Sequence, residues 1–219
     1  MKIISVNVGL PRLVLHNGEP VSTGIFKEPV AHRIMMRTLN LDGDRQADLS
    51  VHGGPEKAVY VYPSEHYDFW KRELPEMDLP WGVFGENLTT TGLLESEVNI
   101  GDKFRIGTTE VMVTQPRMPC YKLGIRFGRA DIIKRFLMSE RTGFYLSVLK
   151  EGEVGAGDEV ELLKKNASEV KVVEVTRLYS SDKGNIDVLR RLIAMEELPE
   201  NWREYLQKRL EKLDTSSGK

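Results

Sequence analysis

The single cysteine of the chain, Cys120, lies in a turn that two prolines stiffen. Pro116 and Pro119 fix their φ angles and lack a backbone N–H, so we expect Cys120 in a rigid loop rather than inside a helix or a central strand. Arg117 and Lys122 flank the cysteine. Nearby positive charge favours the thiolate, the form of cysteine that attacks electrophiles and binds soft metals. These residues alone leave two interpretations open, a reactive thiol and a small buried side chain.

A glycine pair, Gly53 and Gly54, marks a second candidate binding loop. Consecutive glycines adopt backbone conformations that other residues avoid, and they let backbone amides approach an anion closely. His52 precedes the pair and Lys57 follows it. The alternative interpretation of this loop is a tight turn with a surface histidine.

Two further loops carry the polar residues Asn87 and Arg141. The amide of Asn87, at the start of a predicted strand, is suited to reading the edge of a heterocycle, although asparagine also bonds to its local backbone in many turns. Arg141 directly follows a predicted helix. Its guanidinium would either bind a phosphate or carboxylate through two hydrogen bonds or neutralise the C-terminus of that helix.

Composition excludes several classes of partner. At 219 residues the chain is long enough for a main domain with a small appendage, and its 40% hydrophobic and 29% charged residues are ordinary for a globular protein. The formal net charge of -2 gives no electrostatic case for nucleic acid or an anionic membrane as partner. One cysteine fits a reducing compartment, and we see no export signal or membrane-spanning run, so we expect a cytoplasmic protein. The oligomeric state stays open.

Several enzyme classes lack their sequence signatures in this chain. One cysteine and four scattered histidines form no spaced zinc set and no iron–sulfur pattern. The glycine-rich motifs of dinucleotide and phosphate-loop folds are also missing from the sequence. A cysteine hydrolase that pairs Cys120 with His52 stays open on composition alone.

Short segments of alternating or β-branched residues predict a strand-rich fold. They do not alternate regularly with helices, as a doubly wound sheet requires. We therefore expect a mainly β (α+β) fold, a closed or nearly closed β-barrel over residues 1–165, with helices near 63–70 and 130–138. The predicted strands are 3–8, 29–32, 38–41, 58–62, 87–90, 104–106, 110–114 and 159–164, and a returning strand near 170–178 would pack on the barrel.

The hydrophobic period changes from that of a strand to that of a helix after about residue 180. Leu189, Leu192 and Ile193 form one apolar stripe, and residues 202–210 form another. We expect a small helical module over residues 180–213, which would either cap the barrel or dock another protein.

Five motifs in this order resemble the MOSC domain, and the closer resemblance is to its bacterial YiiM-like subfamily. The tail from about residue 185 resembles the three-helix module that follows MOSC domains in this subfamily, so the resemblance spans nearly the whole chain. The motifs that carry it are VHGGPEKA (51–58), FGENLT (84–89), IGD (100–102), QPRMPCYKL (115–123), RTGFY (141–145) and, in the tail, LPENWR (198–203).

This resemblance implies a barrel that binds the molybdenum cofactor, molybdopterin, with the Cys120 thiolate as a sulfur ligand of the metal. It implies an oxidoreductase that reduces N-hydroxylated compounds, including hydroxylamino-purines. The side chain of His52, rather than the resemblance, suggests that this residue would donate a hydrogen bond or a proton near the metal. The residues that would bind the cofactor, chiefly through its phosphate, are Gly53, Gly54, Lys57, Asn87, Arg117 and Arg141.

Electrons for such a reaction would come from a separate protein, because the sequence has no flavin, haem or iron–sulfur motif. This expectation makes the helical tail a candidate docking surface. The alternative function is a carrier that holds the cofactor, or a cysteine persulfide, and hands it on without catalysing turnover of a substrate.

Overall fold

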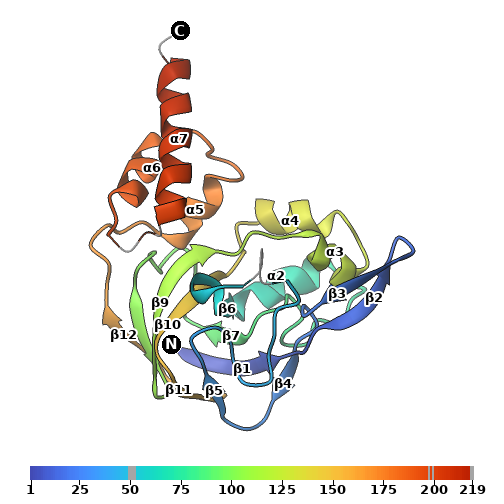
Figure 1. Ribbon diagram of the computed structural model, residues 1–219. Helices are drawn as coiled ribbons and strands as arrows, with labels where there is room; N and C mark the ends of the chain where they lie inside the picture. Colours follow the sequence, from blue (N-terminus) through green and yellow to red (C-terminus); the bar gives the residue numbers. More distant parts are fainter. Residues whose placement is uncertain (49–52, 197, 199, 218–219) are drawn as a thin grey trace.

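An eight-stranded sheet forms the body of the molecule (Figure 1). The computed structural model describes residues 1–48, 53–196, 198 and 200–217. The strand order is β12-β8-β9-β10-β6-β7-β1-β4, and neighbouring strands run antiparallel except β6 and β7, which are parallel. The strands are β1 (Lys2–Val8), β4 (Glu28–Val30), β6 (Val59–Pro63), β7 (Leu88–Thr91), β8 (Lys103–Ile106), β9 (Thr109–Pro116), β10 (Phe144–Lys150) and β12 (Val160–Lys164).

The prediction of a closed or nearly closed barrel fails on closure, because over the described residues the sheet ends at β12 on one side and at β4 on the other. The β12 end of the sheet comes close to the start of β1, the strand next to β4. There Ile3 donates its N–H to the carbonyl of Asp158 at 2.9 Å, and Lys2 forms an isolated bridge with Glu159. Further along, the same edge of β1 pairs with β4, with Val6 opposite Val30. Strand β4 thus takes the edge that β12 would need in order to close the barrel.

A hairpin of β2 (Arg12–His16) and β3 (Glu19–Thr23) projects from the body (Figure 1). Asn17 and Gly18 form its two-residue turn with φ angles of 52° and 85°. Asn-Gly is the sequence that such turns favour, because both residues tolerate positive φ. The sequence analysis predicted no strand here although this signal is present.

A further small sheet pairs β5 (Ile34–Met36) with β11 (Gly152–Val154). The strand predicted at 38–41 is therefore misplaced, since the chain bends there after β5 has ended. Both strands are short, and β11 directly follows β10 in the chain.

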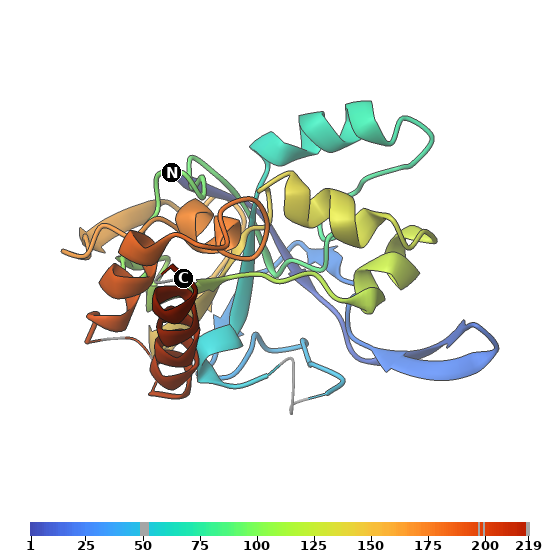
Figure 2. The ribbon, with the colours of Figure 1, turned by 90° about the horizontal axis from the view of Figure 1, so that it is seen from above.

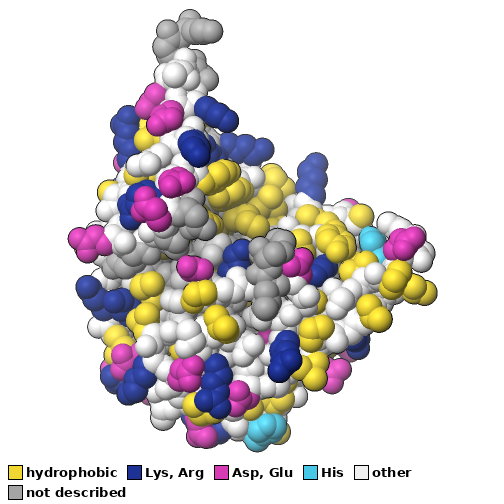
Figure 3. Space-filling view, in the orientation of Figure 1, with side chains coloured by type: hydrophobic (Ala, Val, Ile, Leu, Met, Phe, Trp, Pro, Cys, Tyr) yellow, Lys and Arg dark blue, Asp and Glu magenta, His cyan; other side chains and the backbone are white. Residues whose placement is uncertain are grey.

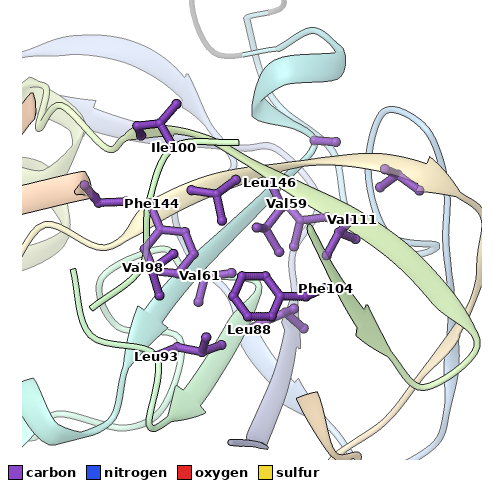
Figure 4. Close-up of a cluster of buried hydrophobic side chains, with 14 of the residues drawn as sticks. Val59, Val61, Leu88, Leu93, Val98, Ile100, Phe104, Val111, Phe144 and Leu146 are labelled. Atoms are coloured by element: carbon purple, nitrogen blue, oxygen red, sulfur yellow. The ribbon is translucent and has the colours of Figure 1, made fainter. Parts of the chain in front are cut away.

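Strand β6 is buried on both faces and separates two hydrophobic clusters. Val59 and Val61 belong to a largely aliphatic cluster on one face of the sheet (Figure 4), whereas Tyr60 and Tyr62 belong to a cluster rich in aromatic residues on the other face. Successive side chains of a strand point to opposite faces, so the Val-Tyr-Val-Tyr sequence sorts small aliphatic from large aromatic side chains.

Helices α2, α3 and α4 pack on the aromatic face of the sheet (Figure 2). The Trp70 and Phe136 rings stack with 5.9 Å between centroids, and Trp70 Nε1 donates to the hydroxyl of Tyr62 at 2.7 Å. The predicted helices near 63–70 and 130–138 correspond to α2 and α4, whereas α3 was not predicted. These helices are α2 (Glu65–Glu73), α3 (Tyr121–Phe127) and α4 (Ile132–Met138).

The C-terminal helices form a module that stands at one end of the sheet (Figures 1 and 3). Its buried side chains, such as Leu189 and Leu206, belong to the same hydrophobic cluster as Leu88 and Phe104 of the sheet. The module and the sheet therefore share one core. The helices are α5 (Val172–Arg177), α6 (Ile186–Ile193) and α7 (Glu200–Ser217).

The returning strand predicted at 170–178 is wrong, because these residues form α5. Their β-branched side chains favour a strand by propensity. However, Glu174 accepts the N–H of Lys171 at 2.8 Å and so caps the start of the helix, and Val172 and Val175 are buried in the shared core. Burial and capping together outweigh the weak intrinsic preference of the valines.

A buried polar network fixes the loop that follows β5 against strands β1 and β6. One carboxylate oxygen of Asp44 accepts the N–H of Gly9 at 2.9 Å and pairs with the Lys27 ammonium. The other accepts from Asn87 Nδ2 at 2.9 Å, and Asn87 Oδ1 accepts the N–H of Tyr60 at 3.0 Å. Burial lowers the pKa of Lys27, while the charge and hydrogen bond of Asp44 oppose this shift.

Asp44→Ala should lower the free energy of unfolding by about 3–5 kcal/mol, because it leaves the buried Lys27 ammonium unpaired. The folded variant would hold Lys27 at a lower pKa than the unfolded chain, whose value is 10.5. Folding then releases a proton at pH values between the folded pKa and 10.5, so the stability of the variant rises with pH in that window. It rises more than that of the wild type, in which Asp44 opposes the lowering of the Lys27 pKa, and the deficit of the variant therefore shrinks. Urea unfolding at neutral pH and at about pH 9.5 measures both effects.

Asp131→Ala is the matched control, since it removes an exposed pair with Arg129. Its stability should stay close to that of the wild type at both pH values. Equal losses in the two variants, or a pH-independent loss in Asp44→Ala, would contradict the role assigned to the buried pair.

Candidate functional site

A pocket with about 590 Å³ of free space, including open solvent at its mouth, lies beside Cys120. Strands β6 and β10 supply one wall, the segments after β3 and β5 supply another, and the turn between β9 and α3 completes it. The described lining residues are Thr23, Gly24, Ile25, Lys27, Asp44, Arg45, Gln46, Ala47, Lys57, Tyr60, Gly85, Asn87, Arg117, Cys120, Lys122 and Tyr145.

Cys120 is half-buried and lies where the proline turn meets helix α3. Strand β9 ends at Pro116, and the residues from Arg117 to Cys120 have no regular structure, in agreement with the predicted rigid loop. The backbone of Cys120 is extended, with φ −124° and ψ 172°, and its carbonyl accepts the N–H of Leu123 at 2.9 Å. The thiol is thereby held at the pocket wall by a strand end on one side and a helix start on the other.

Arg117 is the most deeply buried cation of the pocket, with 5% of its surface exposed. Its guanidinium carbon lies 5.0 Å from the ring centroid of Tyr60 and 5.3 Å from that of Phe136. Its backbone N–H bonds to the carbonyl of Gly143 at 3.2 Å. Within the described part of the chain, Nη1 of Arg117 has no hydrogen-bond partner. A buried, charged donor without a partner is a strong binding group for an anion.

Two tyrosines, Tyr60 and Tyr145, share the pocket wall with Arg117. Their ring centroids are 5.4 Å apart, and the Tyr60 hydroxyl donates to the carbonyl of Thr142 at 2.8 Å. Burial raises the pKa of both tyrosines, although the Arg117 charge opposes the shift, so both hydroxyls keep their protons. Burial lowers the pKa of Arg117, but Tyr60, Tyr145 and Cys120 raise it, and the net shift is upward. The guanidinium therefore stays charged.

The pocket is locally positive in a chain whose formal net charge is -2. Asp44 is the carboxylate among the described lining residues, and it is already paired with Lys27. The excess charge gives the pocket an attractive potential for anionic ligands. The cations of the lining are Lys27, Arg45, Lys57, Arg117 and Lys122.

Four of the residues predicted from the sequence meet in this pocket, namely Lys57, Asn87, Arg117 and Cys120. Lys57 ends the short helix η1 (Pro55–Lys57). The amide of Asn87 bonds within the protein through both of its atoms, so it positions the pocket wall as part of the buried network.

Gly53 and Gly54 are not among the lining residues. Gly54 instead precedes η1 with a φ of 100°, and its carbonyl accepts the N–H of Lys57 at 3.0 Å. Gly54 thus sets the turn that brings Lys57 to the pocket, through a conformation that suits glycine. His52, the predicted catalytic histidine, lies outside the described residues.

Arg141 is not brought into the pocket either. Its Nη1 donates to the carbonyl of Ser139 at 3.0 Å, and its guanidinium carbon lies 4.2 Å from the ring centroid of Phe69. The side chain therefore caps the end of α4 and packs on α2. This is the helix-terminus alternative of the sequence analysis rather than the phosphate contact.

Sequence reasoning missed Lys27, Asp44, Tyr60 and Tyr145 as pocket residues. Both tyrosines occur in strands, where alternating apolar residues are read as core. A usable signal existed for Tyr145, which is the last residue of the RTGFY motif quoted in the sequence analysis.

The arrangement combines a thiol with several cations and two protonated hydroxyls. It is suited to holding an anionic ligand that also offers an electrophile or a soft metal to the sulfur. Over the described ranges, no three His, Cys, Asp or Glu side chains gather to hold a metal ion by themselves. A search of the same residues finds no helix with the length and apolar character that crossing a membrane requires.

Two family models match the chain. The MOSC domain matches residues 48–161, and the YiiM-like, 3-alpha helix domain matches residues 172–213. The uncharacterized protein YflK of Bacillus subtilis is 40% identical over 96% of this chain and 95% of its own length. Protein YiiM of Escherichia coli is 39% identical over 88% of this chain and 85% of its own length.

A protein of Gibberella moniliformis named Reductase is 34% identical over 78% of this chain, which covers 31% of that longer protein. The crystal structure of YiiM from Geobacillus stearothermophilus is similar with a TM-score of 0.79 at 32% identity, over 95% of this chain and 98% of that chain. The matches to YflK and to the Geobacillus structure, which cover 96% and 95% of this chain, extend over the pocket and the helical module alike. The chain therefore belongs to the MOSC domain family, within its YiiM-like group.

Proposed function

We propose that this protein binds the molybdenum cofactor in the Cys120 pocket and reduces N-hydroxylated bases such as hydroxylamino-purines. The observation that carries the proposal is the buried guanidinium of Arg117, whose Nη1 lacks a partner among the described residues while the Cys120 thiol lines the same pocket. A ligand that joins an anionic group to a soft metal would satisfy both.

The pocket residues fit such a ligand chemically. Molybdenum held by a dithiolene is a soft-ligand site, for which the thiolate of Cys120 is the suitable protein donor. The phosphate of the pterin needs charged donors, which Arg117, Lys57 and Lys122 supply. Arg141 is not included in this assignment, because its guanidinium is engaged with α4 and Phe69.

The reaction consumes two electrons and two protons, so that R–NH–OH becomes R–NH₂ and water. When bound, the cofactor would supply the electrons. The protein must deliver protons to the nitrogen and to the departing oxygen. Tyr145 lines the pocket and keeps its hydroxyl proton because burial raises its pKa, so it is placed to donate a hydrogen bond to that oxygen.

Electrons would reach the site from a separate protein. The Gibberella protein named Reductase, of which this chain covers 31%, supports a division of labour in which a MOSC-type segment works with further polypeptide. We propose the helical module as the docking surface for the donor. The single cysteine is consistent with a reducing compartment, and we propose the cytoplasm as the site of action.

Metal content tests cofactor binding directly. Protein purified from a host that makes the cofactor should contain molybdenum and pterin at close to one per chain, and protein from a host unable to make it should contain neither. Mass spectrometry of the metal and fluorescence of the oxidised pterin measure both. Absence of molybdenum from both preparations would refute the proposal. Loaded protein that passes cofactor to an apo-enzyme, yet never reduces hydroxylamino-purine with an artificial electron donor, would identify a carrier.

Cys120→Ser tests the ligand role of the thiol. Serine replaces a soft donor by a hydroxyl that stays protonated near neutral pH, so reductase activity should fall by at least about a hundredfold. The melting temperature should change little, because Cys120 is only half-buried. Turnover and thermal unfolding are measured on the same preparation. A fully active but destabilised variant would assign Cys120 to packing instead.

A further inference from the structure

A second cationic site lies just outside the pocket, around the ring of Phe26. The guanidinium carbon of Arg12 is 3.6 Å from the ring centroid, and that of Arg126 is 5.0 Å from it. Arg12 begins β2 and Arg126 lies in the last turn of α3, and these elements lie side by side (Figures 1 and 2). The His16 and Tyr121 rings, with centroids 6.0 Å apart, bring the hairpin and the helix together.

Neither arginine forms an ion pair with a carboxylate in the described part of the chain, and the buried Nε of Arg126 has no hydrogen-bond partner there. Burial lowers the pKa of Arg126, and the like charge of Arg12 lowers it further. Glu86 and Glu28 act in the opposite direction without reversing the shift. Holding two guanidinium groups around one ring is unfavourable, and a bound anion would offset that repulsion.

The second cationic site, formed by Arg12 and Arg126 around Phe26 and called the outer site below, is continuous with the pocket. Phe26 lies between Ile25 and Lys27, and both of these residues line the pocket. On α3, Lys122 lines the pocket and Arg126 follows it by four positions, which places both side chains on one face of the helix. A ligand that extends out of the pocket along α3 would therefore pass from the inner cations to the outer pair.

We propose that Arg12 and Arg126 bind the phosphate of a nucleotide, so that the pocket takes an N-hydroxylated base in the form of its 5′-monophosphate. This inference rests on the proposed function, because it specifies the substrate of the same pocket. Planar guanidinium groups bind phosphate oxygens through paired hydrogen bonds, and two of them match the dianion in charge. The inner cations would hold the cofactor phosphate, and the outer pair would distinguish a nucleotide from a free base.

The test compares two unreactive purines that differ in the phosphate. Adenosine 5′-monophosphate should bind the purified protein at least about tenfold more tightly than adenosine in calorimetric titrations, and added salt should reduce this difference. The double variant Arg12→Gln/Arg126→Gln should lose the difference while its affinity for adenosine is unchanged. Equal binding of the two purines by the wild type, or a difference that persists in the double variant, overturns the proposal.

Arg129→Gln is the matched control, since Arg129 is a nearby arginine whose charge is paired with Asp131 and Glu76. This variant should bind adenosine 5′-monophosphate more tightly than adenosine to the same extent as the wild type. The single variant Arg12→Gln changes an exposed residue and should reduce the preference in part, which gives a second measurement should the double variant fold poorly. If Arg129→Gln loses the preference for the monophosphate over adenosine as fully as the double variant does, the assignment of the phosphate to Arg12 and Arg126 is overturned.

Metal content separates this inference from the proposed function. Protein that never contains molybdenum, yet prefers the monophosphate through Arg12 and Arg126, supports the outer site and refutes the reductase. Protein that loads molybdenum normally but does not prefer the monophosphate supports the reductase and refutes the outer site. A double variant that loses molybdenum while it keeps the monophosphate preference would assign the pair to the cofactor phosphate, and that result also overturns the proposal.

Discussion

The arrangement of the molecule depends on strand β6, whose two faces are buried in different surroundings. Val59 and Val61 lie in the aliphatic core, and Tyr60 and Tyr62 lie in the aromatic cluster. A shift of one residue in its pairing would place both tyrosines in the aliphatic core, away from the groups that bond to their hydroxyls. The register of β6 therefore also places the ring against which the charge of Arg117 packs. A buried cation with an unused donor is costly for folding, and the anion proposed to bind in the pocket would give that cost a function.

The strand-rich body and the helical tail could be predicted from the sequence, because period-2 and helical patterns are local. Barrel closure could not, since it depends on which strand takes the free edge of β1, and β4 takes it by a long-range pairing. Helix α5 was misread as a strand because its valines have β propensity, whereas the side chains that bury them come from distant segments. The β2–β3 hairpin was missed although Asn17-Gly18 is a local sequence signal for its turn.

The candidate site was predicted best where chain stiffness decides the structure, as in the proline turn at Cys120. It was predicted poorly where the chemistry of a side chain allows two different contacts that the sequence does not distinguish. Arg141 contacts the end of α4 and the ring of Phe69 instead of lining the pocket. Only the tertiary structure decides between these contacts and the predicted phosphate contact. Tyr60 and Tyr145 look like core residues in sequence because each belongs to a buried strand. Their hydroxyls can be recognised as pocket groups only once the structure places the rings beside Arg117.

The core shared by the sheet and the C-terminal helices has a consequence for how such proteins change over time. Two family models divide the chain, yet residues on both sides of that division, among them Leu88 and Leu206, belong to one hydrophobic cluster. The C-terminal helices are therefore not an independent domain that gene fusion could replace with another domain. A lineage that lost them would expose aliphatic side chains of the sheet and would need polar replacements, or a new covering segment, at the same step.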